Sequence, residues 1–266
     1  MQPPVCDAGP MAHIVMVHGA WHGAWCWEDH VAPALRERGH TVHTFDLPGH
    51  DRPGDTRRNW STVGAYLAAI DDAVASSGAS ADELVIVGHS MGGYLTQRWL
   101  EDHTAALGLL VASVPDKGVL GPNLALGREM PGLVAKAAFT ADYSHLVGDD
   151  ELVRDLFFTE QTPAEVVRST TERLQNESAL VINTMIVRLP RPDAVTSPVE
   201  VIAAGRDKVF PVELQYRLAE RYGGRPRIIA GAGHDVMLDD QWPELVDAID
   251  EAIGRRVQSS GSNAST

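Results

Sequence analysis

The chain has few basic residues for its length. Lys and Arg number 22 against 36 Asp and Glu, which gives the 266 residues a formal net charge of −14 at pH 7. A surface of that sign repels nucleic-acid phosphates and anionic membranes, so neither is an expected partner. We therefore expect a small-molecule substrate.

Long apolar runs and cysteines are also scarce. Uninterrupted apolar stretches are short, as LVIV at 84–87 illustrates, whereas a membrane-spanning helix needs about 20 apolar residues. The opening sequence MQPPVCDAGP lacks the basic and apolar regions of a secretory signal, which predicts a cytoplasmic protein. Cys6 and Cys26 allow at most one disulfide, and we expect both to be free thiols.

Short apolar segments alternate with amphipathic ones along most of the chain. The apolar segments are hydrophobic almost throughout, as in strands that are buried on both faces of a parallel sheet. Right-handed crossovers then require helices on both faces, so the sequence predicts an α/β fold with six parallel strands. The expected strands are 13–18, 41–47, 83–89, 106–113, 199–205 and 226–231, and the expected helices are 24–39, 61–77, 91–103, 212–221 and 242–255.

The alternation is interrupted between residues 115 and 198. This segment contains prolines and helix-like stretches at 149–158 and 163–175, but no strong strand pattern. We expect a mainly helical inserted cap there, with residues 12–114 and 199–256 forming the core. Residues 1–11 and 257–266 lack periodicity and are expected to be flexible termini. The stretch NESALVINTMIVRL fits either the cap interior or a homodimer face.

One motif carries the strongest chemical signal. Gly88-His89-Ser90-Met91-Gly92 follows an expected strand and precedes an expected helix. In that context a G-x-S-x-G sequence forms a sharp turn that exposes the serine hydroxyl at the sheet edge. Ser90 is therefore the candidate nucleophile, the alternative being a glycine-rich turn with an incidental serine.

A serine nucleophile needs a base, and the base needs a carboxylate to orient it. Asp207 follows the strand expected at 199–205, and His234 follows the strand expected at 226–231. Loops that follow parallel strands emerge at one edge of the sheet, so both side chains are expected near Ser90. The sequence thus predicts Ser90 as nucleophile, His234 as general base and Asp207 as the orienting acid.

Each of these assignments has an alternative. Asp207 could instead cap the helix at 212–221 or pair with Arg206, and His234 could be an ordinary loop residue. Asp116 competes for the acid role because it follows the strand expected at 106–113. Asp235 competes as well, although a residue adjacent to His234 is expected to point away from it.

A tetrahedral intermediate needs backbone donors for its oxyanion. The N–H of Met91, which starts a helix, is the first candidate. The N–H of Ala20 in the first loop is the second, with Gly19 expected to allow a sharp turn there. The alternative is a glycine turn without a donor role.

Metal and phosphate sites are not expected. His18 and His22 have i, i+4 spacing, but they fall in a loop and no Asp, Glu or Cys cluster with ligand spacing accompanies them. No G-x-x-x-x-G-K-[ST] motif occurs, and no G-x-G-x-x-G follows an expected strand. We therefore expect neither a metal nor an organic cofactor.

Several motifs together resemble a known family over residues 13–255. They are VHGAWHGAWCW, DLPGH, GHSMGG, VPD at 114–116, GRDKVFP and GAGHDVML. The chain resembles the α/β-hydrolases, and among them the plant methylesterase and hydroxynitrile-lyase group with its bacterial esterase relatives. The resemblance implies the α/β-hydrolase fold and the same Ser-His-Asp set.

The resemblance also separates two activities. The lyases of this group have a threonine where this chain has Gly19 and a lysine where it has Asp235. A lysine would stabilise departing cyanide, whereas an aspartate would oppose it, so the comparison favours ester hydrolysis. One departure lies at residues 51–54, which read DRPG where relatives commonly have Gly and Ser in a loop that borders the active-site mouth.

The expected function is hydrolysis of a small or medium carboxylic ester, such as a methyl ester or lactone. A lyase or eliminating enzyme on the same three residues, and a ligand-binding protein with this fold, are the alternatives. Apolar cap residues could line the substrate pocket or could simply pack the cap onto the core. They are Met130, Leu133, Phe139, Tyr143, Phe157 and Phe158.

Overall fold

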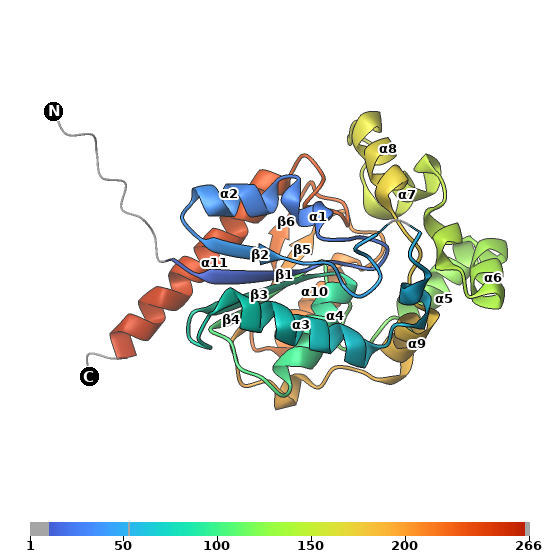
Figure 1. Cartoon of the computed structure of the whole chain (residues 1–266). Coiled ribbons are helices and arrows are strands. Elements are labelled where there is room, and N and C mark those ends of the chain that lie inside the picture. Colours follow the sequence, from blue (N-terminus) through green and yellow to red (C-terminus); the bar gives the residue numbers. More distant parts are fainter. Residues whose placement is uncertain (1–10, 53, 264–266) are drawn as a thin grey trace.

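A single parallel sheet organises the chain. The computed structural model describes residues 11–52 and 54–263, and its six strands run in the order β2-β1-β3-β4-β5-β6 (Figure 1). Every neighbouring pair is parallel, which confirms the predicted α/β fold with six strands. The strands are β1 His13–Val17, β2 Thr41–Thr44, β3 Leu84–His89, β4 Leu107–Val111, β5 Val199–Ala204 and β6 Arg227–Ile229.

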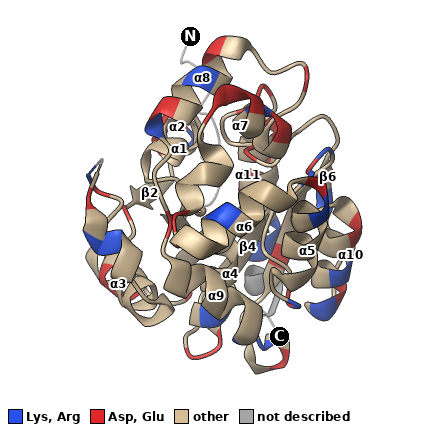
Figure 2. Ribbon diagram, turned by 90° about the vertical axis from the view of Figure 1, so that its right-hand side faces the viewer, with Lys and Arg blue, Asp and Glu red and all other residues tan. Residues whose placement is uncertain are grey.

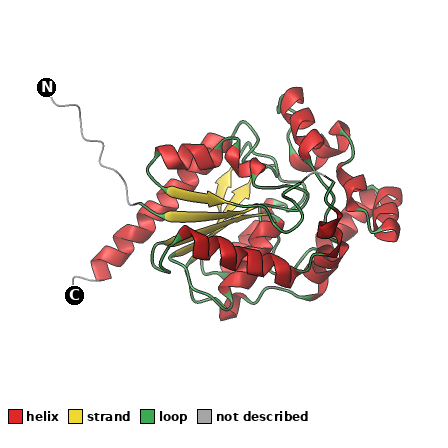
Figure 3. Cartoon of the chain, viewed as in Figure 1, coloured by secondary structure: helices red, strands yellow, loops and turns green. Residues whose placement is uncertain are grey.

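Helices cover both faces of this sheet (Figure 3). On β1, Ile14 and Met16 face a core that includes residues of α2 and α11, whereas Val15 and Val17 face a second core with residues of α3, α4 and α10. Alternate residues of a strand point to opposite faces, so a strand buried on both must be apolar throughout. The helices are α1 Trp25–Glu28, α2 Val31–Glu37, α3 Val63–Ser77, α4 Met91–Leu100, α10 Val212–Arg221 and α11 Trp242–Asn263.

Two predicted elements have different limits in the structure. The helix expected at 24–39 is divided into α1 and α2, because Pro33 has no N–H and its ring conflicts with a helical carbonyl at residue 29. The last helix continues to Asn263, so the described part of the terminus at 257–266 is helical rather than without regular structure.

The two cysteines fare differently. Cys26 is a free, buried thiol, as expected. Cys6 lies outside the described residues. The same holds for residues 1–10 of the terminus expected at 1–11.

Residues 115–198, called the cap segment below, connect β4 to β5. Their described structure is helical without a strand, and both helix-like stretches of the sequence form helices. In Figure 1 these helices lie beyond the carboxyl ends of the strands. They are α5 Leu120–Glu129, α6 Pro131–Thr140, α7 Asp150–Phe157, α8 Ala164–Arg173 and α9 Ala179–Val187.

The stretch NESALVINTMIVRL, which fitted either the cap interior or a homodimer face, contains helix α9. Its residues Val181, Ile182 and Met185 are buried in the same core as α3 and α4, so this face packs within the chain. The homodimer stays a prediction. No helix among the described residues combines the length and apolar character needed to cross a membrane.

Candidate active site

Ser90 occupies the junction between β3 and α4. Its backbone has φ 53° and ψ −116°, a region that side chains rarely adopt and that costs about 1–3 kcal/mol. The turn is tightly packed, because a Cβ on Gly92 would collide with the carbonyl oxygen of Val17 on β1. Ser90 is 8% exposed. The strained, glycine-dependent turn is the geometry that the G-x-S-x-G motif predicts.

The expected acid and base meet at this edge of the sheet. Nδ1 of His234 donates to Oδ2 of Asp207 over 2.8 Å. The other carboxylate oxygen, Oδ1, accepts the N–H groups of Val209 and Phe210, each at 2.8 Å. The carboxylate is therefore fixed by its own loop and in turn fixes the orientation of the imidazole.

The base is also tied to the strand that carries Ser90. The imidazole of His89 donates from Nε2 to the carbonyl oxygen of His234 over 3.0 Å, and the two rings lie 4.8 Å apart. Burial lowers the pKa of His89 to about 3, with the neighbouring His234 adding to the effect. A neutral His89 thus links the nucleophile's strand to the base's loop.

Two opposing effects set the pKa of His234. Burial alone lowers this pKa, but the charge of Asp207 and its hydrogen bond raise it, and the net shift is upward. Asp207 therefore stabilises the imidazolium that would form when the base accepts a proton.

The competing acids have other partners. Asp116 lies 3.5 Å from Arg221, and the carboxylate of Asp235 faces His22 at 2.9 Å. Pro211, not Asp207, occupies the N-cap of α10. Of the aspartates considered from the sequence, Asp207 alone is hydrogen-bonded to the ring of His234 in the part of the chain that the structure describes.

Both expected oxyanion donors lie beside Ser90. Met91 is the first residue of α4, where backbone N–H groups have no acceptor within the helix. Ala20 lies in the loop after β1 and is 5% exposed. A Cβ built on the preceding Gly19 would lie 3.1 Å from Cβ of Ser90, which places this loop against the nucleophile.

The role expected of Gly19 needs a correction. The residue with positive φ in this loop is Trp21, at 66°, not Gly19. What Gly19 provides is space, because a Cβ there would lie 2.9 Å from Nδ1 of His89. Trp21 keeps its left-handed backbone through tertiary contacts: its carbonyl accepts the N–H of Gln175, and its Nε1 donates to the carbonyl of Tyr143. Sequence reasoning missed Trp21, since its conformation depends on these cap residues.

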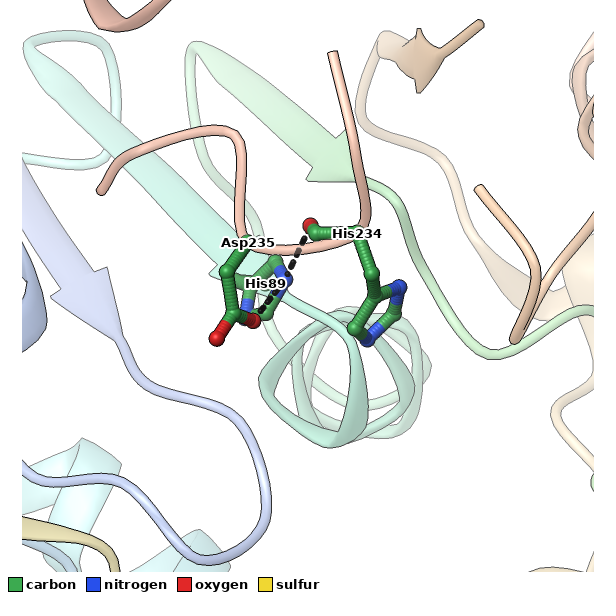
Figure 4. Close-up of side chains that lie close together, drawn as sticks. All are labelled: His89, His234 and Asp235. Atoms are coloured by element: carbon green, nitrogen blue, oxygen red, sulfur yellow. Dashed lines mark hydrogen bonds and ion pairs between the residues drawn. The ribbon is translucent and has the colours of Figure 1, made fainter. Parts of the chain in front are cut away.

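Figure 4 shows a cluster of possible metal ligands formed by His89, His234 and Asp235. One nitrogen or oxygen atom from each lies within 4.8 Å of the others. Nε2 of His89 already donates to a carbonyl, however, and Asp235 is paired with His22. Hydrogen bonding within the protein therefore accounts for this cluster.

The apolar cap candidates separate into two groups. Phe157 is 2% exposed, and its ring lies 5.7 Å from that of His234 and 5.9 Å from that of Trp21. Phe139, in contrast, is 92% exposed and is not at the site. Phe210, which sequence reasoning did not select although it lies in the GRDKVFP motif, packs 5.5 Å from His234. Of the other candidates, Phe158 is buried and Met130, Leu133 and Tyr143 are half-buried.

The loop that departs from the family pattern faces a separate cavity. Asp51 and Gly54 line a space of about 660 Å³ between the core and the cap segment, together with Arg58 and Arg173. Neither Ser90 nor His234 lines it. A place for this loop at the active-site mouth, as in relatives, stays a prediction.

Comparisons with known proteins agree with this fold. A model described as "Alpha/beta hydrolase family" matches residues 14–248. The esterase PIR7B of Oryza sativa subsp. japonica is 37% identical over 109 residues, which cover 40% of each chain. The carbendazim hydrolyzing esterase of Nocardioides sp. (strain SG-4G) is 31% identical over 243 residues, covering 86% of this chain and 95% of that protein.

A solved structure gives the same fold. The methylesterase MES16 from Arabidopsis aligns with a TM-score of 0.68 at 19% identity, over 91% of this chain and 98% of that one. At this level of identity the likeness concerns the fold alone.

Proposed function

Since the chain belongs to the α/β-hydrolase family, we propose that it hydrolyses carboxylic esters with Ser90 as the nucleophile. The observation that carries this proposal is the joint placement of three groups at one sheet edge. Ser90 has the strained backbone of a nucleophile turn, and the His234–Asp207 pair is tied to the adjacent His89. The relatives named as esterases support the same class of reaction.

The first step is acyl transfer to the enzyme. The hydroxyl oxygen of Ser90 attacks the ester carbonyl carbon, and His234 accepts the hydroxyl proton at Nε2. The carbonyl π bond becomes an oxyanion, which the N–H groups of Ala20 and Met91 stabilise. As the intermediate collapses, His234 returns the proton to the departing alcohol and an acyl-serine remains.

The second step reverses these roles with water as the nucleophile. His234 takes a proton from water, whose oxygen attacks the acyl carbon, and the carboxylic acid leaves as Ser90 regains its proton. Asp207 keeps the imidazole in one orientation through both steps, because two backbone N–H groups hold its carboxylate in place. No organic cofactor or metal enters either step.

The substrate is proposed to be a small or medium ester, such as a methyl ester or lactone. Phe157 contributes an apolar side chain beside His234, which favours an apolar acyl or alcohol group over a charged one. In this proposal residues 115–198 act as the cap over the site. We keep the cytoplasmic location as a prediction.

The test is hydrolysis of a panel of p-nitrophenyl and methyl esters by the wild type and by Ser90→Ala under identical conditions. We expect turnover in the wild type and a collapse by roughly 10⁴ to 10⁶ in the variant. No turnover by a folded wild type, or undiminished turnover in Ser90→Ala, would refute the proposal.

Product analysis distinguishes hydrolysis from elimination on the same residues. Hydrolysis yields an acid and an alcohol with one oxygen from water, which ¹⁸O-labelled water would place in the acid. Elimination yields an alkene and the acid without that label. Labelled acid is the expected result.

A further inference from the structure

A second histidine–aspartate pair lies behind the proposed active site. His22 and Asp235 are 1% and 0% exposed, and Nε2 of His22 lies 2.9 Å from Oδ2 of Asp235. The residues are 213 positions apart in the chain. Asp235 directly follows the proposed base, yet its side chain leaves the loop in a different direction (Figure 4).

The partners of His22 fix the orientation of its ring. Its Nδ1 donates to the carbonyl oxygen of Ala20 over 2.8 Å, and its Nε2 faces the carboxylate of Asp235. Burial raises the pKa of Asp235, but the charge and hydrogen bond of His22, together with the nearby His89 and His234, lower this pKa overall. The carboxylate therefore holds the ring of His22 with Nδ1 directed at Ala20.

His18 contacts the same loop from the other side of Ala20 in the chain. Its Nδ1 donates to the carbonyl of Gly19 over 2.8 Å, and its Nε2 accepts the N–H of Leu47 over 3.0 Å. One donor and one acceptor correspond to a neutral imidazole. Burial lowers the pKa of His18 well below its usual value, and His50 adds to this effect.

The two histidines together hold the peptide units on either side of Ala20. His18 binds the carbonyl of Gly19, which belongs to the same peptide plane as the N–H of Ala20. In a trans peptide the C=O and N–H point in opposite directions, so the Ala20 N–H is directed away from His18. His22 binds the next carbonyl, that of Ala20 itself.

We propose that the His22–Asp235 pair positions the backbone of Ala20, and with it the N–H that serves as an oxyanion donor, with Asp235 fixing the orientation of the His22 ring. This inference rests on the proposed function and extends it. Neither residue is catalytic; both are positioning residues that act through the backbone of Ala20. The pair also joins the loop of the base to the loop of the oxyanion donor, which two different strands supply.

Other titratable groups surround the pair without replacing it. His89 lies 3.8 Å from the second oxygen of Asp235, and Cys26 and His234 are near enough to interact with its charge. His50 donates to the carbonyl of His22. Trp25 stacks on the ring of His22, with Arg173 lying over the indole. The carboxylate of Asp235 is the group that binds Nε2 of His22 directly.

The experiment replaces the ion pair by apolar side chains of similar size, His22→Phe with Asp235→Leu. Such replacements of a buried ion pair are often neutral for stability, yet this one removes the donor to Ala20. We expect kcat on the best ester to fall about 10- to 100-fold, less than the 10²–10³ expected when a donor is lost outright. KM should change less than threefold, because ground-state binding does not use the oxyanion donor.

A trifluoromethyl ketone provides a readout specific to the oxyanion. The hydroxyl of Ser90 adds to its carbonyl carbon, the π bond becomes an alkoxide and the proton passes to His234. Affinity for this inhibitor should weaken by the same factor as kcat. Asp235→Asn, which keeps the shape of the side chain but removes its charge, should give a smaller loss of kcat and of inhibitor affinity. If the double variant does not fold, this single variant tests the inference.

The control is His40→Phe with Asp250→Leu, a histidine–aspartate pair at 3.0 Å that lies away from the proposed site and whose aspartate is exposed. It should keep the wild-type kcat. A folded double variant or Asp235→Asn with wild-type kcat, or one whose kcat falls without weaker ketone binding, would overturn the inference. Ester turnover by the wild type and its loss in Ser90→Ala are measured in the same experiment. Failure of the proposed function would appear in these two proteins, and failure of this inference would appear only in the His22 and Asp235 variants.

Discussion

The carboxyl edge of the sheet and the cap segment differ in how deeply their side chains are buried. At the sheet edge, Ser90, Asp207 and His234 are 8%, 6% and 2% exposed. In the cap segment, α5 has no buried residue, and Phe139 on α6 is 92% exposed. Charged residues gather on α7, α8 and α10, whereas α6 and α9 are largely uncharged (Figure 2).

This difference separates the proposed chemistry from substrate selection. The proposed nucleophile, acid and base follow strands whose backbones are fixed by neighbouring strands. Phe157 is the clearest exception, because it belongs to α7 and packs against His234. Substitutions at the edge should therefore change turnover, and substitutions in the cap should divide according to burial.

The largest effect is expected for Asp207→Asn. An amide cannot accept the imidazole proton in the same way and favours the wrong tautomer of His234, so kcat should fall by about 10⁴. Asp116→Asn, which changes an aspartate paired with Arg221, is the matched control and should retain near wild-type kcat. Steady-state kinetics of both variants provide the measurement. A greater loss of kcat in Asp116→Asn than in Asp207→Asn would contradict the assignment of Asp207 as the orienting acid.

Burial predicts unequal costs for two phenylalanines of the cap. Phe157→Ala removes a fully buried ring that contacts His22, Trp21 and His234, and should lower the free energy of unfolding by about 3–5 kcal/mol. Phe139→Ala removes an exposed ring and should change it by at most about 0.5 kcal/mol. Urea denaturation of both variants measures this difference, and equal costs would contradict the division of the cap by burial.

The pH dependence of turnover gives a smaller effect. Because His234 must be neutral to act as a base, kcat/KM should fall as pH decreases through its pKa, which lies above the usual 6.5. In Asp207→Asn the raising influence is lost while burial still lowers this pKa. The acid limb of the residual activity should therefore move to lower pH, and an unmoved limb would show that Asp207 does not set the protonation of His234.

The smallest expected effect concerns the exposed face of the cap. Phe139→Ser should leave kcat and KM within about twofold of the wild type, as for surface substitutions away from any functional contact. A large rise in KM would show that this face takes part in substrate binding, and the contrast between edge and cap would then fail. The ester panel used for the wild type provides the measurement.

Local sequence patterns determined the sheet and the position of the candidate nucleophile. Strands buried on both faces must be apolar, and a G-x-S-x-G sequence between a strand and a helix predicts the sharp turn at Ser90. These requirements act between neighbours in the chain or along a single element. They can therefore be recognised without knowing the three-dimensional arrangement.

Only the tertiary structure decided the contacts that surround the predicted site residues. The left-handed backbone of Trp21 depends on hydrogen bonds to Gln175 and Tyr143, and the orientation of the His22 ring depends on Asp235, 213 positions along the chain. Phe139 and Phe157 are alike in sequence character, yet one is exposed and the other lies against His234. Burial and distant pairing arise only when the elements pack, because a residue's own neighbours in sequence do not specify the partners that the fold brings to it.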